Sequence, residues 1–464
     1  MSLRLYDTRT RTVRPLELLR EGRVGVYVCG PTVQAAPHIG HLRSAVALDV
    51  LHRWLRESGL EVTFVRNVTD VDDKIIKDAA ASGEPWWALA QRNARAFDRA
   101  YDAVQVLPAT GEPHVTGHIS EIVALIDELV QDGKAYESDG DVLLSVRAVP
   151  SYGQLSGQSP DALRAGETAG AAKRDPLDFA LWKAAKPSEP QWPSPWGVGR
   201  PGWHIECSAM AVAYLGEQFD LHAGGLDLVF PHHENEIAQS TAAGHGFARH
   251  WLHHGLVTAA GGEKMSKSLG NSITVEQALA TTRPQVLRYG LGGVHYRSSM
   301  QWSAGVAGEA EAAYGRIETF VRNATEATMG VEPDPSATAA SWQQFAAALD
   351  DDLGVPQALA TLHEGVRAGN SQLAAGQLPA LAATLCVVRR MLRVLALDPV
   401  DQWPPAGAGE LTGVVDVLVD LAVQARADAR ARKDWASADS VRDRLSAAGV
   451  VLEDTAAGVR WRLR

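Results

Sequence analysis

The alternation of apolar and polar positions near the start of the chain predicts a strand, a helix and a second strand. Residues 24–30, VGVYVCG, form an apolar run of the length of a buried strand. From about His41, apolar residues recur at helical spacing, at Leu42, Ala45, Val46, Val50, Leu51 and Leu55. Gly59 marks the predicted helix end, and residues 60–70 form the second strand. This order predicts a right-handed parallel βαβ unit of a Rossmann-like nucleotide-binding sheet.

Changes of composition along the chain predict five segments. Residues 1–110 hold the first half of the sheet, and residues 111–200, rich in Gly, Pro and Ser, are interpreted as an insertion. Residues 201–305 complete the sheet, and the amphipathic Ala/Leu-rich residues 306–400 predict a helical bundle. Residues 401–464 combine a linker with a small separate unit. The predicted fold class is α/β, a parallel sheet split by an insertion and followed by a helical bundle and a C-terminal module.

Composition narrows the classes of function. The 464 residues are 46% hydrophobic and 21% charged, which is typical of globular proteins, and the net charge of −11 means that a polyanion must meet local basic patches. No apolar run reaches the ~18–20 residues of a membrane span, and no signal peptide is visible, so we expect a cytoplasmic protein without a membrane partner. The three distant cysteines argue against a disulfide framework, and Cys386, in an Ala/Leu-rich stretch, is expected in the core.

The segment PHIGH has the residue types that bind a phosphate group. His38 and His41 lie on either side of Gly40, where the first helix is predicted to begin. The N-terminus of a helix favours anions, because its unpaired N–H groups and its dipole present positive charge. Taken alone, the segment is explained equally well as two surface histidines at a turn.

The segment KMSKS follows a Gly-rich stretch in the second half of the sheet. It contains Lys264 and Lys267, two of only nine lysines in a chain that otherwise uses arginine. A lysine on a flexible stem can follow the charge of a phosphate group, which a planar guanidinium does less easily. A solvated basic loop is the alternative for this segment alone. The two segments together are far more specific than either one.

Four side chains from distant parts of the chain are acceptable zinc ligands. Cys29 ends the first strand, Cys207 lies in GWHIECSAM, and His232 and Glu236 share one face of a predicted helix. Because they are scattered and not arranged in CxxC pairs, spacing alone leaves the metal assignment open. Two neighbours are alternatives for the same ligand roles, His233 and Glu234.

HIGH and KMSKS together resemble the motifs of class I aminoacyl-tRNA synthetases, and the resemblance covers essentially the whole chain. VYVCGPTV, NVTDVDDKI, GWHIECSAM and HAGGLDLVFPHHENEIAQS are similar to signature stretches of the cysteinyl-tRNA synthetase family. The resemblance implies an enzyme that activates L-cysteine with ATP and Mg²⁺ and transfers it to tRNA(Cys). It assigns catalysis to the motif residues His38, His41, Lys264 and Lys267.

The resemblance also implies one zinc ion, bound by Cys29, Cys207, His232 and Glu236. In the family the substrate thiolate is understood to coordinate this ion directly. The chemistry suits the task, because a hydrophobic pocket separates such similar substrates by only ~10–200-fold. A thiol loses its proton on a metal far more readily than a serine hydroxyl does. Zinc could therefore select cysteine without an editing site.

Further roles carry over from the family. Substrate contacts are implied for Gly30, Thr69, Trp203 and His222. ATP contacts are implied for Gly40, Gly225, Asp227 and Lys267. From the residue types alone, Trp203 fits a core aromatic and Asp227 a turn former equally well. The loop before HIGH, PTVQAAP, lacks the aromatic–acidic pair of the commoner family pattern, which leaves the ATP contacts of that loop open.

The C-terminal segment is basic within an acidic protein. From Arg426 to Arg464 it has nine basic and six acidic residues, a net charge of +3. Charge alone fits a solvated helix, whereas the resemblance implies a module that reads the tRNA anticodon. Arg460 and Trp461 are then expected to contact RNA, through phosphate attraction and base stacking.

Two other functions are compatible with the motifs. The mycothiol-pathway ligase, which joins cysteine to glucosaminyl-inositol, resembles the same core and zinc site but lacks the full anticodon module. A non-catalytic, zinc-dependent RNA-binding protein descended from a synthetase need not keep both HIGH and KMSKS. The basic tail and the intact motifs favour the cysteine–tRNA ligase, which we expect to be a monomer.

Overall fold

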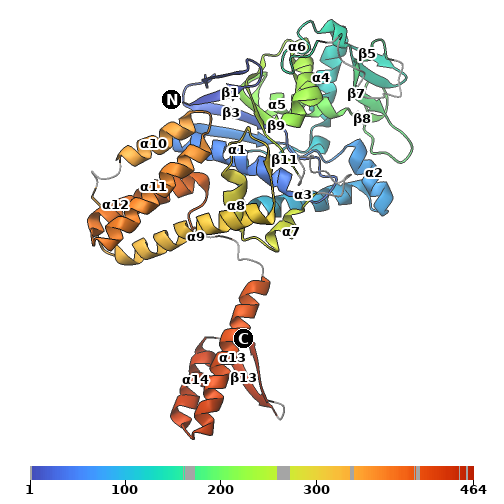
Figure 1. Cartoon of the computed structure of the whole chain (residues 1–464). Coiled ribbons are helices and arrows are strands. Elements are labelled where there is room, and N and C mark those ends of the chain that lie inside the picture. Colours follow the sequence, from blue (N-terminus) through green and yellow to red (C-terminus); the bar gives the residue numbers. More distant parts are fainter. Residues whose placement is uncertain are drawn as a thin grey trace. The chain divides into compact units, whose positions relative to one another are not determined.

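Figure 1 shows the computed structural model of the chain, which divides into two compact units, Met1–Trp403 and Pro404–Arg464. The structure describes residues 3–159, 161, 173–258, 272–334, 339–401, 403, 408–448, 450–455 and 458–463. Within these ranges, no helix is long and apolar enough to cross a membrane.

The first unit is built on four parallel strands in the order β10-β9-β3-β4. Their bounds are β3 Arg23–Val28, β4 Glu61–Arg66, β9 Gln218–Gly225 and β10 Phe247–His254. Helix α1 (Ile39–Glu57) connects β3 to the neighbouring β4. The predicted βαβ unit and parallel sheet are therefore confirmed. A short antiparallel hairpin, β1 (Arg4–Asp7) and β2 (Thr12–Pro15), precedes the sheet.

An insertion separates the two halves of the sheet. After β4 come helices α2 (Asp73–Ser82) and α3 (Trp86–Ala103), and then α4 (Ile119–Gln131). A separate antiparallel sheet follows, with strands β5 Ala135–Ser138, β6 Asp141–Leu144, β7 Phe179–Ala184 and β8 Gly199–Pro201. Helix α5 (Trp203–Leu215) then leads back into β9.

The second half of the sheet continues through short elements. Between β9 and β10 lie two helical turns, η4 (Leu226–Leu228) and η5 (Val229–His233), and helix α6 (Glu234–Ala242). After β10, a parallel pair of two-residue strands, β11 (Val257–Thr258) and β12 (Met300–Gln301), encloses two further helices. These are α7 (Val275–Leu279) and α8 (Pro284–Gly292).

The predicted helical bundle is present and shares a core with the sheet. Its helices are α9 Ala304–Ala327, α10 Ala339–Asp350, α11 Val355–Ala374 and α12 Leu378–Leu395. One buried cluster includes Val26 of β3, Leu51 of α1, Phe345 of α10 and Leu392 of α12, each 0% exposed. Because burial of apolar area is the dominant favourable term in folding, the bundle and the sheet stabilise one another.

The prediction that Cys386 lies in the core is wrong, because its side chain is exposed. It lies on α12, whose buried residues include Leu381, Leu385, Val388 and Leu392. At helical spacing, Cys386 falls on the same face as Arg390 and Arg393, which are also exposed. The abundance of Ala and Leu in this stretch concealed which face points outward.

The second unit consists of a helical pair and a hairpin. Helices α13 (Ala408–Ala431) and α14 (Trp435–Ala447) precede the antiparallel strands β13 (Val450–Thr455) and β14 (Gly458–Leu463). The predicted RNA-contacting residues are consecutive on β14. In the hairpin register, the backbone of Arg460 lies opposite Glu453 and that of Trp461 opposite Leu452. The Trp461 side chain is half-buried.

Candidate active site

A cavity of about 1250 Å³ opens at the carboxyl ends of the parallel strands, the usual place for a ligand in such a sheet. Eleven of the residues singled out in the sequence line it: Cys29, Gly30, His38, Gly40, His41, Thr69, Trp203, Cys207, Gly225, Asp227 and His232. They come from strand ends and helix starts that are far apart in the chain. The sheet therefore brings the predicted phosphate-binding and metal-binding residues to one cavity.

Four of the predicted residues converge at one wall of this cavity: Cys29, Cys207 and His232, which line it, and Glu236. One ligand atom from each residue lies within 4.8 Å of all the others. Glu236 Oε1 is 3.1 Å from His232 Nε2 and accepts a hydrogen bond from the Cys29 thiol at 3.3 Å. Two sulfurs, an imidazole and a carboxylate in a tetrad of this size suit zinc.

A second group of donors shares Cys29 and Glu236 but uses His222 and His233 in place of Cys207 and His232. His222 and His233 are both 0% exposed and do not line the cavity. In the first group, Cys29, Cys207 and His232 all line it. The first group therefore presents three donors to the cavity, and the second presents only Cys29. Both sets suit zinc by their chemistry, so it is access to the cavity that favours the first group.

The protonation of the tetrad reflects its crowding. A hydrogen bond from Cys29 lowers the pKa of Cys207 to about 6, whereas burial raises the pKa of Cys29 well above its usual value. Burial alone would lower the pKa of His232, but the Glu236 carboxylate and the Cys207 sulfur raise it to about 10. The negative charges of the group thus lie on Glu236 and Cys207. A bound cation would neutralise them and displace the protons of Cys29 and His232.

His222 was expected to contact the substrate, but the structure places it outside the cavity lining, against the candidate metal ligand Glu236. Its Nε2 lies 2.8 Å from Glu236 Oε2, and its ring stacks on Trp251 with centroids 4.5 Å apart. A ligand carboxylate held in this way is oriented by its partner, an arrangement common around metal sites. The Trp203 ring, by contrast, lines the cavity and stacks on His232 at 4.4 Å.

The HIGH segment forms the start of α1, where its two histidines cap the helix. His38 Nδ1 accepts the Gly40 N–H at 3.1 Å, and the His38 N–H donates to His41 Nδ1 at 3.2 Å. An imidazole nitrogen that accepts a hydrogen bond carries no proton, so both rings are neutral and hold their proton on Nε2. The rings stack with centroids 3.8 Å apart. This tautomer can donate to a phosphate oxygen in the cavity.

Gly30 and Thr69 are held together by Asn67, the first residue of the NVTDVDDKI stretch, to which the sequence analysis gave no role. Asn67 is 0% exposed; its Oδ1 accepts the Gly30 N–H at 2.8 Å, and its Nδ2 donates to Thr69 Oγ1 at 3.1 Å. A Cβ at position 30 would lie 1.6 Å from the Asn67 carbonyl oxygen, so only glycine fits there. Two signals were available in the sequence: Asn67 follows the end of a strand, and it opens the NVTDVDDKI stretch.

The remaining predicted residues are placed as follows. Gly225 ends β9 and Asp227 lies in the turn η4, both on the cavity wall. Lys264 and Lys267 lie outside the described residues. Arg460 and Trp461 belong to the second unit and are described there.

Comparison with known proteins assigns the chain to a family. Residues 15–311 match the class I (C) tRNA synthetase catalytic domain, residues 344–397 a DALR domain, and residues 419–462 the cysteinyl-tRNA ligase anticodon binding domain. A cysteine–tRNA ligase of Streptomyces avermitilis is 55% identical over 473 residues, covering 100% of this chain and 99% of the relative. The chain belongs to the cysteinyl-tRNA synthetase family. A Micrococcus luteus cysteine–tRNA ligase is 53% identical, with 100% of both chains covered.

Solved structures of other class I synthetases share the fold of this cysteinyl-tRNA synthetase family member. Methionyl-tRNA synthetase of Mycobacterium tuberculosis, solved with methionyl-adenylate, has a TM-score of 0.59 at 19% identity over 81% of this chain and 90% of that chain. A LeuRS of Agrobacterium radiobacter K84, solved with tRNA, has a TM-score of 0.61 at 10% identity over 84% and 88%. At these identities the likeness concerns the fold alone.

Buried histidines predict that this synthetase is destabilised by mild acid. Burial lowers the pKa of His41 to about 3 and the pKa of His52, His250 and His254 to about 4. Below their unfolded pKa of ~6.5, the unfolded chain binds protons that the folded chain does not, at up to ~1.4 kcal/mol per histidine per pH unit. The thermal midpoint should therefore fall steadily from pH 7 to pH 5. A midpoint that is unchanged or higher at pH 5 would contradict the burial of neutral histidines.

Proposed function

We propose that the chain is a cysteine–tRNA ligase, which activates L-cysteine with ATP and transfers it to tRNA(Cys). The observation that carries the proposal is the joining of two sites in one cavity: a tetrad of thiol, imidazole and carboxylate groups, and a helix start capped by two neutral histidines. The match of residues 419–462 to an anticodon binding domain, with full-length identity to cysteine–tRNA ligases, favours this function over the mycothiol-pathway ligase.

In this proposal, Cys29, Cys207, His232 and Glu236 hold one zinc ion. When bound, the ion would favour the thiolate of cysteine over the hydroxyl of serine, which is a far weaker acid and a poor soft ligand. His222 orients the Glu236 carboxylate, and the Trp203 ring supports His232 from the cavity side. Gly30 and Thr69, fixed by Asn67, line the cavity beside Cys29 and are proposed to contact the amino acid.

The ATP contacts are proposed for the other side of the cavity. A carboxylate oxygen of cysteine would attack the α-phosphorus, and pyrophosphate would leave with the electrons of the broken P–O bond. The Nε2–H groups of His38 and His41 donate to phosphate oxygens, and Gly40 leaves room for a close approach. Gly225 and Asp227 are proposed to hold the nucleoside, and Mg²⁺ would accompany the triphosphate.

The second half-reaction needs tRNA. In the proposal, the terminal hydroxyl of tRNA(Cys) attacks the activated carbonyl and AMP leaves. Arg460 and Trp461, adjacent on β14, are proposed to contact the anticodon. The monomeric state and the cytoplasmic location remain predictions from the sequence.

Replacing Lys267 with alanine should slow adenylate formation. Its charge is expected to act chiefly in the transition state, so kcat should fall by ~10²–10³-fold while KM for cysteine stays unchanged. Steady-state ATP–pyrophosphate exchange measures both constants. The Lys186→Ala variant is a matched control, because Lys186 is exposed in the insertion and does not line the cavity. A change confined to KM for ATP would assign Lys267 to ground-state binding.

The proposed function is tested by ATP–pyrophosphate exchange with the purified full chain. Exchange should depend on cysteine, and serine at equal concentration should support less than ~0.1% of the rate, because a pocket alone discriminates by only ~10–200-fold and would leave ~0.5–10%. Exchange that serine supports equally well would contradict selection by a metal-bound thiolate. Absence of cysteine-dependent exchange would contradict the proposed function itself.

A further inference from the structure

Glu234 is a buried carboxylate between two of the proposed zinc ligands. It begins α6, is 0% exposed, and lies two residues after His232 and two before Glu236. Among the described residues, neither group of converging metal donors includes it. A buried charge without compensation is costly, so the partners of this carboxylate indicate its role.

The Glu234 carboxylate binds the backbone of one loop in the insertion. Gly153 donates its N–H to Oε1 at 2.9 Å, and Leu155 and Ser156 donate theirs to Oε2 at 3.2 and 2.7 Å. Gly153 has a φ of +95°, and a Cβ there would lie 2.0 Å from the Gln158 carbonyl oxygen. The loop therefore has a backbone shape that requires glycine at the point where it meets Glu234.

The next residue on α6 makes a second link to the same loop. Asn235 Oδ1 accepts a hydrogen bond from the Tyr152 hydroxyl at 2.6 Å, and both side chains are buried. Two successive residues of the ligand helix thus bind one short stretch of the insertion, residues 152–156. This stretch does not line the cavity, so its contact with the site passes through α6.

The backbone that carries His232 needs such support. His232 lies in η5, Val229–His233, a π-type turn in which Phe230 departs from helical geometry with φ −139° and ψ 133°. Regular α-helix begins only at Glu234. A turn without the regular i→i−4 hydrogen-bond ladder is fixed less by its own backbone than a helix is. The bonds of Glu234 and Asn235 fix the junction from outside.

We propose that Glu234 is a positioning residue for the metal site. By binding the loop of residues 153–156, it fixes the start of α6 and so the spacing between His232 and Glu236. The inference rests on the proposed function, because it assumes that these two residues hold zinc. It makes a loop of the insertion part of the structure that selects cysteine.

The Glu234→Gln variant tests the inference. The amide keeps the shape of the side chain but removes the negative charge of the carboxylate, whose two oxygens accept three N–H bonds. Zinc transfer to a chromophoric chelator such as 4-(2-pyridylazo)resorcinol, followed by absorbance, should be ~10–100-fold faster than in the wild type, the effect typical of an outer-shell partner. In ATP–pyrophosphate exchange, KM for cysteine should rise while KM for ATP stays unchanged.

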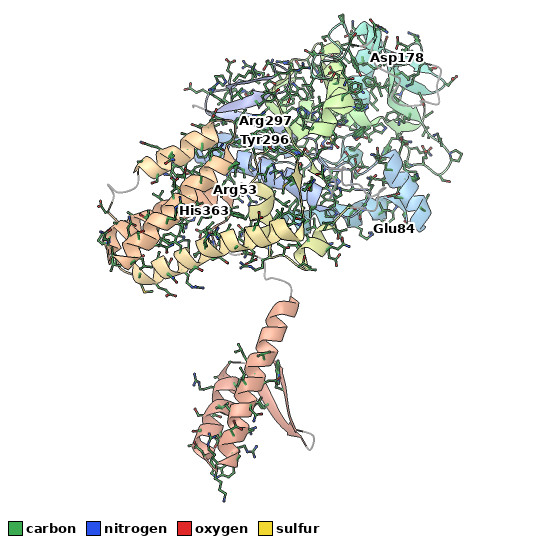
Figure 2. All side chains as sticks on the ribbon, viewed as in Figure 1. Arg53, Glu84, Asp178, Tyr296, Arg297 and His363 are labelled. Atoms are coloured by element: carbon green, nitrogen blue, oxygen red, sulfur yellow. The ribbon has the colours of Figure 1, made fainter. Side chains whose placement is uncertain are left out.

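The Asp178→Asn variant is the matched control. Asp178, labelled in Figure 2, is also 0% exposed within the insertion and accepts three hydrogen bonds, from the Tyr136 hydroxyl and the backbone N–H groups of Val146 and Asp175. None of these three bonds involves α6. Its loss should lower the thermal midpoint but leave the zinc transfer rate and KM for cysteine at wild-type values.

The outcomes separate this inference from the proposed function. Wild-type zinc transfer and KM in Glu234→Gln would overturn the positioning role, and so would an equal acceleration in Asp178→Asn. If Glu234→Gln does not fold, Tyr152→Phe provides a second test, because it removes one hydrogen bond to Asn235. This variant should accelerate zinc transfer several-fold, and a wild-type rate would overturn the inference.

A wild-type protein that binds no zinc would overturn the proposed metal site and this inference together, whereas zinc binding without cysteine-dependent exchange would overturn only the proposed activity.

Discussion

Replacing Cys207 with serine should abolish zinc binding and cysteine activation together. Cys207 is 1% exposed. Its sulfur lies within 4.8 Å of the Cys29 sulfur and of one donor atom each from His232 and Glu236. A serine hydroxyl is a poor zinc ligand, because it does not ionise readily. Exchange should therefore fall by more than ~100-fold, beyond the usual effect of losing an outer-shell partner. Metal analysis by plasma mass spectrometry and the exchange assay measure the two effects on one preparation.

Cys386→Ser supplies the control for this experiment. It makes the same chemical change at an exposed site on α12, outside the cavity. It should keep one zinc per chain and full exchange activity. Normal zinc content in Cys207→Ser would show that Cys207 is not a ligand and would shift the assignment toward the second donor group, with His222 and His233.

Removing residues 404–464 should separate the two half-reactions. The chain divides into compact units at Trp403/Pro404, so the first unit is expected to keep its own core and its cavity. Cysteine-dependent exchange should survive, because the cavity belongs wholly to that unit. Charging of tRNA should fall by about 10²-fold or more, because anticodon contacts help to position the reacting end and a small misplacement is costly.

The exchange rate of the truncated protein is the internal control, because it reports whether the catalytic unit has folded. Charging at the full-length rate would contradict an RNA-binding role for the second unit. Loss of both activities would show that the first unit depends on the second for folding, and not that residues 404–464 bind tRNA.

The fold could be predicted from the sequence because its signals are local. The apolar run of β3 and the helical spacing of α1 report burial directly, and together they imply a parallel crossover. The same reasoning failed at Cys386, since a stretch in which most residues are Ala or Leu has no clear polar face. It was accurate for the type of element and wrong for the face of a single residue.

The site was harder to predict, because its geometry depends on contacts between distant segments. The tetrad could be named only through family resemblance, as Cys29 and Cys207 have no diagnostic spacing. Asn67 and Glu234 lie in stretches that the resemblance singled out, but the buried hydrogen bonds that they make to backbone leave no pattern in the sequence that would assign them these roles. His222 has the residue type of a substrate contact, and only the structure shows that it faces Glu236.

The charging of tRNA(Cys) with labelled cysteine by the full-length protein tests the central claim most directly. We expect the protein to form cysteinyl-tRNA in a reaction that requires ATP and is lost in Cys207→Ser, and we expect no transfer of cysteine to glucosaminyl-inositol. Protein that activates cysteine, fails to charge any tRNA and instead consumes the amino sugar would contradict it.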